Sequence, residues 1–196
     1  MWVLAVLTIL VGNFTGLYQP NLKRMLAYSS ISHSGYMMLA VLAFSTRSSG
    51  ALLLYSAAYS VATVTAFGIL ILIRGAKGND LYSSFDGIAK KNPVEAVCLT
   101  IALLSLTGIP PLAGFMAKYY LFTTALEQGY LWLVIVAVLG SAISVTYYFR
   151  PIVAMYLKEG DGIKLEAGVS YKTHIIFLTI LTLLLGLLPA LLINVS

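Results

Sequence analysis

Long apolar stretches separated by short polar segments dominate the pattern of the chain. Each stretch is about 20 residues long, the length that a helix needs to cross the hydrocarbon core of a membrane. Barrel strands would instead alternate polar and apolar positions over about 10 residues, and lipid cannot satisfy irregular backbone. The sequence therefore predicts an all-α membrane protein with a single transmembrane domain over residues 1–196. The six expected spans are residues 1–20, 28–46, 50–73, 94–126, 129–149 and 173–193.

The composition excludes a soluble enzyme and a disordered chain. Hydrophobic residues make up 60% and charged residues 10% of the chain, against about 45–50% and ~25% in soluble domains. The charges lie in the gaps between apolar stretches and form no basic face, so we expect no nucleic-acid partner. Cys98 is the only cysteine and no nucleotide-binding loop is present, so we expect neither a cofactor nor a metal in this chain.

The basic residues predict how the chain lies in the membrane. Alternate loops share a side, and one side receives ten Lys and Arg residues while the other receives only Arg47. Because cytoplasmic loops carry the excess of basic residues, the first, third and fifth loops are expected inside and both ends of the chain outside. The ten are Lys23, Arg24, Arg74, Lys77, Lys90, Lys91, Arg150, Lys158, Lys164 and Lys172.

The fourth span is long and contains a Gly-Ile-Pro-Pro sequence at its centre. Pro110 and Pro111 remove two backbone donors, and Gly108 adds conformational freedom. We expect two half-helices, about 94–107 and 112–127, joined by an unwound segment; a simple proline kink is the alternative. Discontinuous helices of this kind are typical of ion and substrate sites in transporters.

Two short motifs bear on how helices begin and pack. Asn92, Pro93 and Glu95 fit the N-cap, first and third positions of the fourth span, so we interpret Glu95 as a capping carboxylate rather than a proton carrier. Gly12 and Gly16 form a GxxxG motif, which lets another helix approach closely.

Lys118 is the only Lys, Arg, Asp or Glu well inside a span. It lies nine residues before Glu127, about 13 Å along the helix at ~1.5 Å per residue. A charge at that depth is costly, which makes Lys118 our main candidate for a proton-carrying group. A lysine that snorkels to the surface or is structurally paired is the alternative, and the spans contain no carboxylate that could pair with it.

Three further side chains are candidates for a proton path. Tyr55 and Tyr59 are four residues apart and share one helix face; hydrogen bonding between helices is their simpler role. His33 lies near the start of the second span, where histidine is typical of an interfacial position but can also relay protons. His174, at the start of the last span, is a weaker candidate.

Three stretches resemble chain N (subunit 2) of the antiporter-like membrane subunits of proton-pumping NADH:quinone oxidoreductase, complex I. Residues 12–40 read GNFTGLYQPNLKRMLAYSSISHSGYMMLA, residues 104–122 read LSLTGIPPLAGFMAKYYLF, and residues 140–157 read GSAISVTYYFRPIVAMYL. This resemblance implies a family chain of about fourteen helices built on two inverted five-helix repeats. The chain would be the C-terminal part of such a longer chain, namely the second inverted repeat plus the last helix.

The resemblance also implies a function, a membrane subunit that takes part in proton translocation coupled to quinone reduction in other subunits. By resemblance, Lys118 matches the lysine of the family's broken helix and belongs to its proton path. The chain would be a non-redox subunit of the enzyme in a bacterial inner membrane. The expected partners are the lipid bilayer and other membrane subunits of complex I, with NADH, FMN, iron–sulfur clusters and quinone in partner subunits.

Two alternatives to that function remain open. One is a component of a multisubunit sodium/proton antiporter, and the other is a structural spacer without its own proton path. The multisubunit sodium/proton antiporters that this chain resembles carry two histidines at the positions of Tyr55 and Tyr59. This difference argues against an antiporter component.

Overall fold

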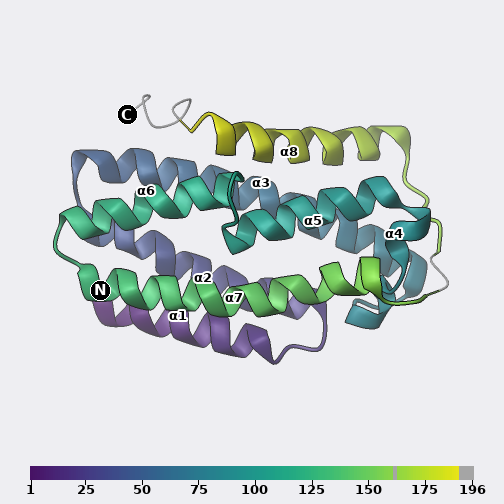
Figure 1. Ribbon diagram of the computed structural model, residues 1–196, viewed down its shortest axis with the longest axis horizontal. Coiled ribbons are helices and arrows are strands. Elements are labelled where there is room, and N and C mark those ends of the chain that lie inside the picture. Colours follow the sequence, from purple (N-terminus) through teal and green to yellow (C-terminus); the bar gives the residue numbers. More distant parts are fainter. Residues whose placement is uncertain (161–162, 190–196) are drawn as a thin grey trace.

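The computed structural model describes residues 1–160 and 163–189, and in that part the chain forms helices and no β-strand (Figure 1). The all-α prediction is therefore confirmed for the described residues. An isolated bridge pairs Asn21 with Leu81. The helices are α1 (Trp2–Leu17), α2 (Leu22–Ala43), α3 (Thr46–Lys77), the short 3-10 helix η1 (Tyr82–Phe85), α4 (Ile88–Lys91), α5 (Pro93–Thr107), α6 (Ala113–Glu127), α7 (Leu131–Leu157) and α8 (Val169–Leu187).

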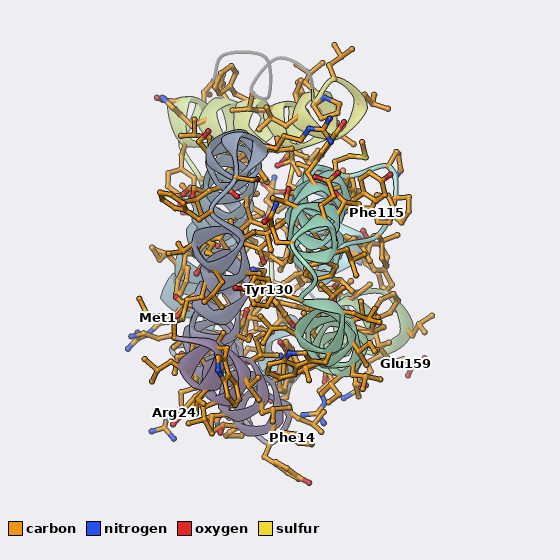
Figure 2. All side chains as sticks on the ribbon, turned by 90° about the vertical axis from the view of Figure 1, so that its left-hand side faces the viewer. Met1, Phe14, Arg24, Phe115, Tyr130 and Glu159 are labelled. Atoms are coloured by element: carbon orange, nitrogen blue, oxygen red, sulfur yellow. The ribbon has the colours of Figure 1, made fainter. Side chains whose placement is uncertain are left out.

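Three helices of the described part are long and apolar enough to cross a membrane, judged by length and composition. They are Arg47–Lys77, Leu131–Leu157 and Val169–Leu187, while α1 and α5 are apolar but shorter. Most helices run along the long axis of the molecule, and α8 lies on one side of it, next to α3, α5 and α6 (Figure 1). Figure 2 looks along the bundle from the end that holds Met1 and Tyr130.

Several helix boundaries differ from the predicted spans. The second helix begins at Leu22 rather than residue 28, because the side chain of Asn21 accepts a hydrogen bond from Arg24 N at 2.9 Å and caps it. Helix α7 likewise continues past residue 149, the end of the predicted span, through Pro151 to Leu157. Hydropathy measures only the apolar part of a helix, so it misses polar turns at either end. Residues 190–193 of the last predicted span lie outside the described residues.

The chain turns between α5 and α6. Gly108 ends α5 with φ 93°, in the left-handed region that glycine tolerates best, and its N–H donates to Leu104 O at 3.0 Å. Helix α6 begins five residues later and packs back against α5, so that a Cβ at Gly114 would collide with the backbone carbonyl of Ser105. Only glycine fits this contact without a shift of the backbone.

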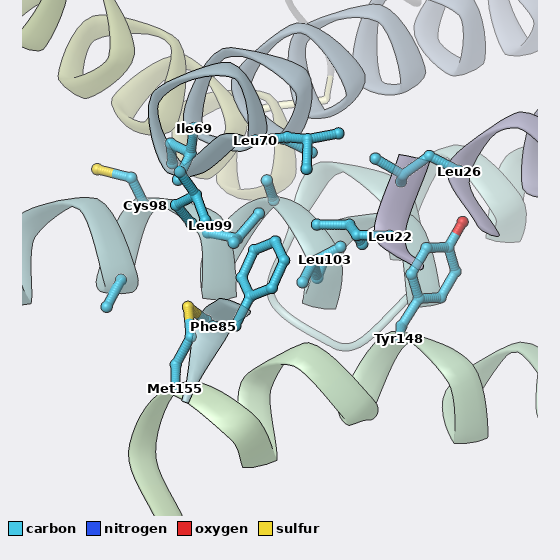
Figure 3. Close-up of a cluster of buried hydrophobic side chains, with 14 of the residues drawn as sticks. Leu22, Leu26, Ile69, Leu70, Phe85, Cys98, Leu99, Leu103, Tyr148 and Met155 are labelled. Carbon is cyan, nitrogen blue, oxygen red and sulfur yellow. The ribbon is translucent and has the colours of Figure 1, made fainter. Parts of the chain in front are cut away.

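Two clusters of buried apolar side chains fill the bundle. One gathers around Phe85, with Leu99, Leu103 and Met155 packed beside it (Figure 3). The other lies toward the end that holds Met1 and includes Ile9, Leu39, Leu121 and Ala137. Buried tyrosines border both clusters, Tyr147 and Tyr148 in the first and Tyr36 and Tyr55 in the second. These tyrosines also form hydrogen bonds with the buried polar residues His33 and Asn13.

Candidate functional site

Lys118 lies on α6 with its side chain in the interior, and the residue is only 6% exposed. Its Nζ donates three hydrogen bonds, to Thr107 O at 2.8 Å, Leu106 O at 3.1 Å and Ser141 Oγ at 2.7 Å. The two carbonyls belong to the last turn of α5, where no following helical N–H is present to bind them and the helix dipole is negative. All three protons of an ammonium group therefore find acceptors.

This geometry excludes a snorkelling Lys118 and leaves two possibilities, a proton-carrying lysine and a structurally paired one. A snorkelling lysine would extend its ammonium to the surface, which the burial excludes. The lysine is instead held in place, and the acceptors are carbonyls and a hydroxyl rather than a carboxylate. Among the residues that the structure describes, no Asp or Glu forms an ion pair with it.

His33 lies in the middle of α2 and is 4% exposed. Its Nδ1 is 2.8 Å from the hydroxyl of Tyr55 on α3, and its Nε2 is 3.2 Å from the hydroxyl of Tyr148 on α7. The hydroxyl of Ser29 contacts Tyr148 in turn. The interfacial interpretation of His33 is wrong, because the capped start of α2 at Leu22 carries this residue into the core.

Tyr55 and Tyr59 both face His33, as their shared helix face predicts. Tyr55 forms the hydrogen bond between α2 and α3, while the ring centroid of Tyr59 lies 4.7 Å from that of His33. This bond joins two helices, and the place of Tyr55 on a proton path stays a prediction. His174 is exposed and binds Ser170 O of its own helix at 2.6 Å, away from this site.

A small cavity separates His33 from Lys118, and both residues line it. About 10 Å³ of it is open to the centre of a water molecule, which is about the space that one water needs. The other lining residues are Tyr55, Ala58, Tyr59, Ser105, Leu106, Gly114 and Ala117.

Lys118 also lines a second, much larger space, an open groove of about 530 Å³ between α6 and α7. Thr107 and Ser141 lie in its wall, beside apolar residues such as Phe122 and Val138. The lysine thus stands between a small cavity that faces His33 and a groove that opens to the surface of the described chain.

A second set of buried polar groups lies beside the lysine. Nζ of Lys118 lies 5.3 Å from the ring centroid of Tyr36. The Tyr36 hydroxyl accepts from Asn13 Nδ2 at 3.1 Å, and Asn13 Oδ1 accepts from the Tyr147 hydroxyl at 2.8 Å. The sequence reasoning missed these residues together with Tyr148 and Ser141. Asn13 is a polar residue inside an apolar stretch and could have been noticed, whereas Ser141 carries no such signal.

The residues of the helix break contribute in different ways. A Cβ at Gly108 would lie 3.0 Å from Cδ of Lys118, so glycine leaves room for the lysine stem. Pro110 and Pro111 lie in the turn between α5 and α6 and are exposed. They belong to the segment that separates α5 from α6, and neither forms a hydrogen bond with Lys118.

Glu95 does not cap α5 as predicted. Its carboxylate is buried and lies 2.9 Å from Nζ of Lys172 on α8. The side chain of Asn92 is also engaged elsewhere, since it accepts from Leu165 N and donates to Ile163 O, both at 2.7 Å. These contacts come from residues more than 70 positions away, which local spacing cannot reveal. Among the described residues, no three His, Cys, Asp or Glu side chains lie together as a metal site would need.

Comparisons with known proteins show the family to which the chain belongs. A family model described as NADH:quinone oxidoreductase/Mrp antiporter, TM matches residues 1–144. A relative from Trichlorobacter lovleyi, named NADH-quinone oxidoreductase subunit N, is 45% identical over 82% of this chain and 33% of its own length. A relative of the same name from Cytophaga hutchinsonii is 39% identical over 98% of this chain and 42% of its own length.

A solved structure has the same fold. A chain of respiratory complex I from Thermus thermophilus matches with a TM-score of 0.87 and 33% identity, over 98% of this chain and 44% of that one. The chain spans about one third to two fifths of the length of the two curated relatives. With a family model that covers residues 1–144 of 196, the chain belongs to the NADH:quinone oxidoreductase/Mrp antiporter family of transmembrane proteins.

Proposed function

We propose that this chain is part of a subunit N of NADH:quinone oxidoreductase and takes part in moving protons across a membrane. The names of the two curated relatives and the complex I neighbour support this assignment. Electron transfer itself belongs to partner subunits, which would hold NADH, FMN, the iron–sulfur clusters and quinone. This chain offers Cys98 as its only thiol, too few for an iron–sulfur cluster.

The proposed topology has six membrane spans, in which α5 and α6 together make one discontinuous span. The chain would be the second inverted repeat of the family fold plus the last helix. The end of the bundle that carries α4 holds most basic residues and would face the inside, with Met1 and the end of α8 on the outward side. Because the two relatives are bacterial, we propose the bacterial inner membrane.

One observation carries the proposed mechanism, the position of Lys118 between the cavity and the groove. A neutral Lys118 amine would accept a proton from a water in the cavity and become an ammonium ion, while the His33 imidazole returns a proton to that water and is itself reprotonated through its hydrogen-bonded tyrosine. The carbonyls at the end of α5 and the hydroxyl of Ser141 stabilise that charge. Release of the proton to water in the groove restores the amine, and a charge that moves in a neighbouring subunit would drive the release.

The test is NADH-driven proton uptake into inverted membrane vesicles that contain the whole complex. Lys118→Ala and Lys118→Met are compared with the wild type, and Lys90→Met, an exposed lysine at the end with α4, is the matched control. Complex content and NADH oxidation with a non-quinone acceptor are measured in the same vesicles. Loss of uptake in both Lys118 variants, with intact assembly and normal uptake in Lys90→Met, supports the mechanism.

Other results point to the two alternatives. Normal proton uptake in an assembled Lys118→Met complex would contradict the proton path and leave a structural spacer. Sodium-dependent proton exchange in the absence of NADH would instead indicate a sodium/proton antiporter component, which the family also includes.

A further inference from the structure

Two hydrogen-bonded chains of buried side chains cross the core near Lys118. The first joins Ser29, Tyr148, His33 and Tyr55. The second joins the hydroxyl of Tyr147 to Asn13 and Asn13 to the hydroxyl of Tyr36. The two chains run side by side, because the rings of Tyr147 and Tyr148 lie 4.7 Å apart.

The two chains differ in what they can do with a proton. Hydroxyl groups and the two nitrogens of an imidazole can accept a proton on one side and give one up on the other. The amide of Asn13 accepts only at Oδ1 and donates only at Nδ2. A proton that arrives at Oδ1 therefore has no route to Tyr36. Asn13 thus blocks proton transfer along the second chain.

Asn13 is held firmly enough to orient its neighbours. It is fully buried, and its Nδ2 donates to Ile9 O at 2.8 Å as well as to the Tyr36 hydroxyl at 3.1 Å. The close packing of Gly140 sets this position, since a Cβ there would lie 3.0 Å from Asn13 Nδ2. Because both Nδ2 and Oδ1 of Asn13 are hydrogen-bonded, the Asn13 amide fixes the orientation of the Tyr36 ring.

The ring that Asn13 orients is the one beside the lysine. The Tyr36 side chain is 1% exposed, and Lys118 Nζ lies over its ring at 5.3 Å from the centroid. An aromatic face attracts a cation, and the attraction grows when both groups are removed from water. Among the described residues no carboxylate forms an ion pair with Lys118, and this ring supplements the carbonyls and the hydroxyl that hold the ammonium group.

We propose that Asn13 is a positioning residue that, through Tyr36, holds an aromatic ring against the Lys118 ammonium, and that the Tyr147–Asn13–Tyr36 chain carries no proton. This inference rests on the proposed function, because it concerns the same lysine. It assigns the proton route to the side of His33 and gives Asn13 an indirect role.

The test is a double-mutant cycle on the assembled complex, with the ratio of protons pumped to NADH oxidised as the readout. The variants are Asn13→Leu, Tyr36→Met and the double variant, with Tyr36→Phe to retain the ring. Tyr171→Phe is the matched control, because it also removes a tyrosine hydrogen bond, from the hydroxyl to Gly68 O at 2.8 Å, at a different helix contact.

We expect Asn13→Leu to lower the ratio about threefold, the size expected for one member of a buried polar network. Tyr36→Met should lower it further, Tyr36→Phe should retain more than Tyr36→Met, and the double variant should match Tyr36→Met because Asn13 acts through the ring. Tyr171→Phe should keep the wild-type ratio.

Three results would overturn the inference. The first is that Asn13→Leu and Tyr36→Met lower the pumping ratio independently, so that their effects multiply in the double variant. The second is that Asn13→Leu loses pumping as completely as Lys118→Ala. The third is that Asn13→Leu reduces complex content while the pumping ratio stays unchanged. If Lys118→Ala itself pumps normally, the proposed function fails instead, so the two failures are distinguishable.

Discussion

Lys118 and Ser141 form a hydrogen bond of 2.7 Å that joins α6 to α7 beside the groove. The hydroxyl of Ser141 also reaches Thr107 O at 3.4 Å, and Lys118 Nζ reaches the same carbonyl at 2.8 Å. Each of the three groups thus lies within hydrogen-bond distance of the other two, and they connect the end of α5 with the middles of α6 and α7. The charge of this lysine on α6 is therefore held by acceptors that α5 and α7 supply.

Ser141→Ala should weaken proton pumping and leave assembly intact. The substitution removes one of three acceptors, and a hydrogen bond to a charged group contributes about 1.5–3 kcal/mol. We expect a severalfold lower rate of NADH-driven uptake in vesicles. Ser34→Ala, which removes a hydroxyl bonded only within its own helix, should pump normally. Equal rates in both variants would argue that Ser141 does not support the charge.

His33→Gln should reduce pumping strongly, and His174→Gln should not. Glutamine can keep hydrogen bonds to Tyr55 and Tyr148 but cannot carry a proton between them, because its donor and acceptor are different atoms. His174 is exposed and bonded to its own helix, so it controls for the loss of a histidine. The two variants are compared by proton uptake at equal complex content, and normal uptake in His33→Gln would remove histidine from the path.

Gly114→Ala should destabilise the complex or displace α6. The added Cβ collides with the Ser105 carbonyl, and overpacking of this kind costs about 1–3 kcal/mol. Gly75→Ala is the control, because nothing lies within 4 Å of a Cβ there and alanine favours a helix interior by roughly 0.5–1 kcal/mol. Thermal unfolding of the purified complex should show a lower midpoint for Gly114→Ala alone, and matching midpoints would contradict the close contact.

Lys172→Met should destabilise the contact of α8 with α5. It leaves the buried Glu95 carboxylate without its cation, which we expect to cost roughly 1–3 kcal/mol; the partial exposure of Lys172 keeps the cost below that of a fully buried pair. Arg47→Gln, which breaks the exposed pair with Glu127, should have little effect. Thermal unfolding of both variants checks this contrast, and a larger effect of Arg47→Gln would reverse the assignment.

The sequence by itself determined the all-α class and singled out Lys118, the residue at the centre of the candidate site. A lysine inside an apolar stretch is costly wherever that stretch folds, so Lys118 could be identified without knowing its neighbours. The break at Gly108, Pro110 and Pro111 could be located for the same reason, because missing donors and a flexible glycine act on the backbone locally.

Only the tertiary structure decided what surrounds the lysine. Ser141, Tyr36 and the end of α5 meet Lys118 from three other helices, and spacing along the chain does not encode contacts over such separations. Because local spacing does not encode such contacts, the sequence pattern predicts a cap at Glu95 and an interfacial position for His33, and the structure shows neither. A local pattern reports the preference of a segment, whereas the partner of a buried polar group depends on which helices pack together.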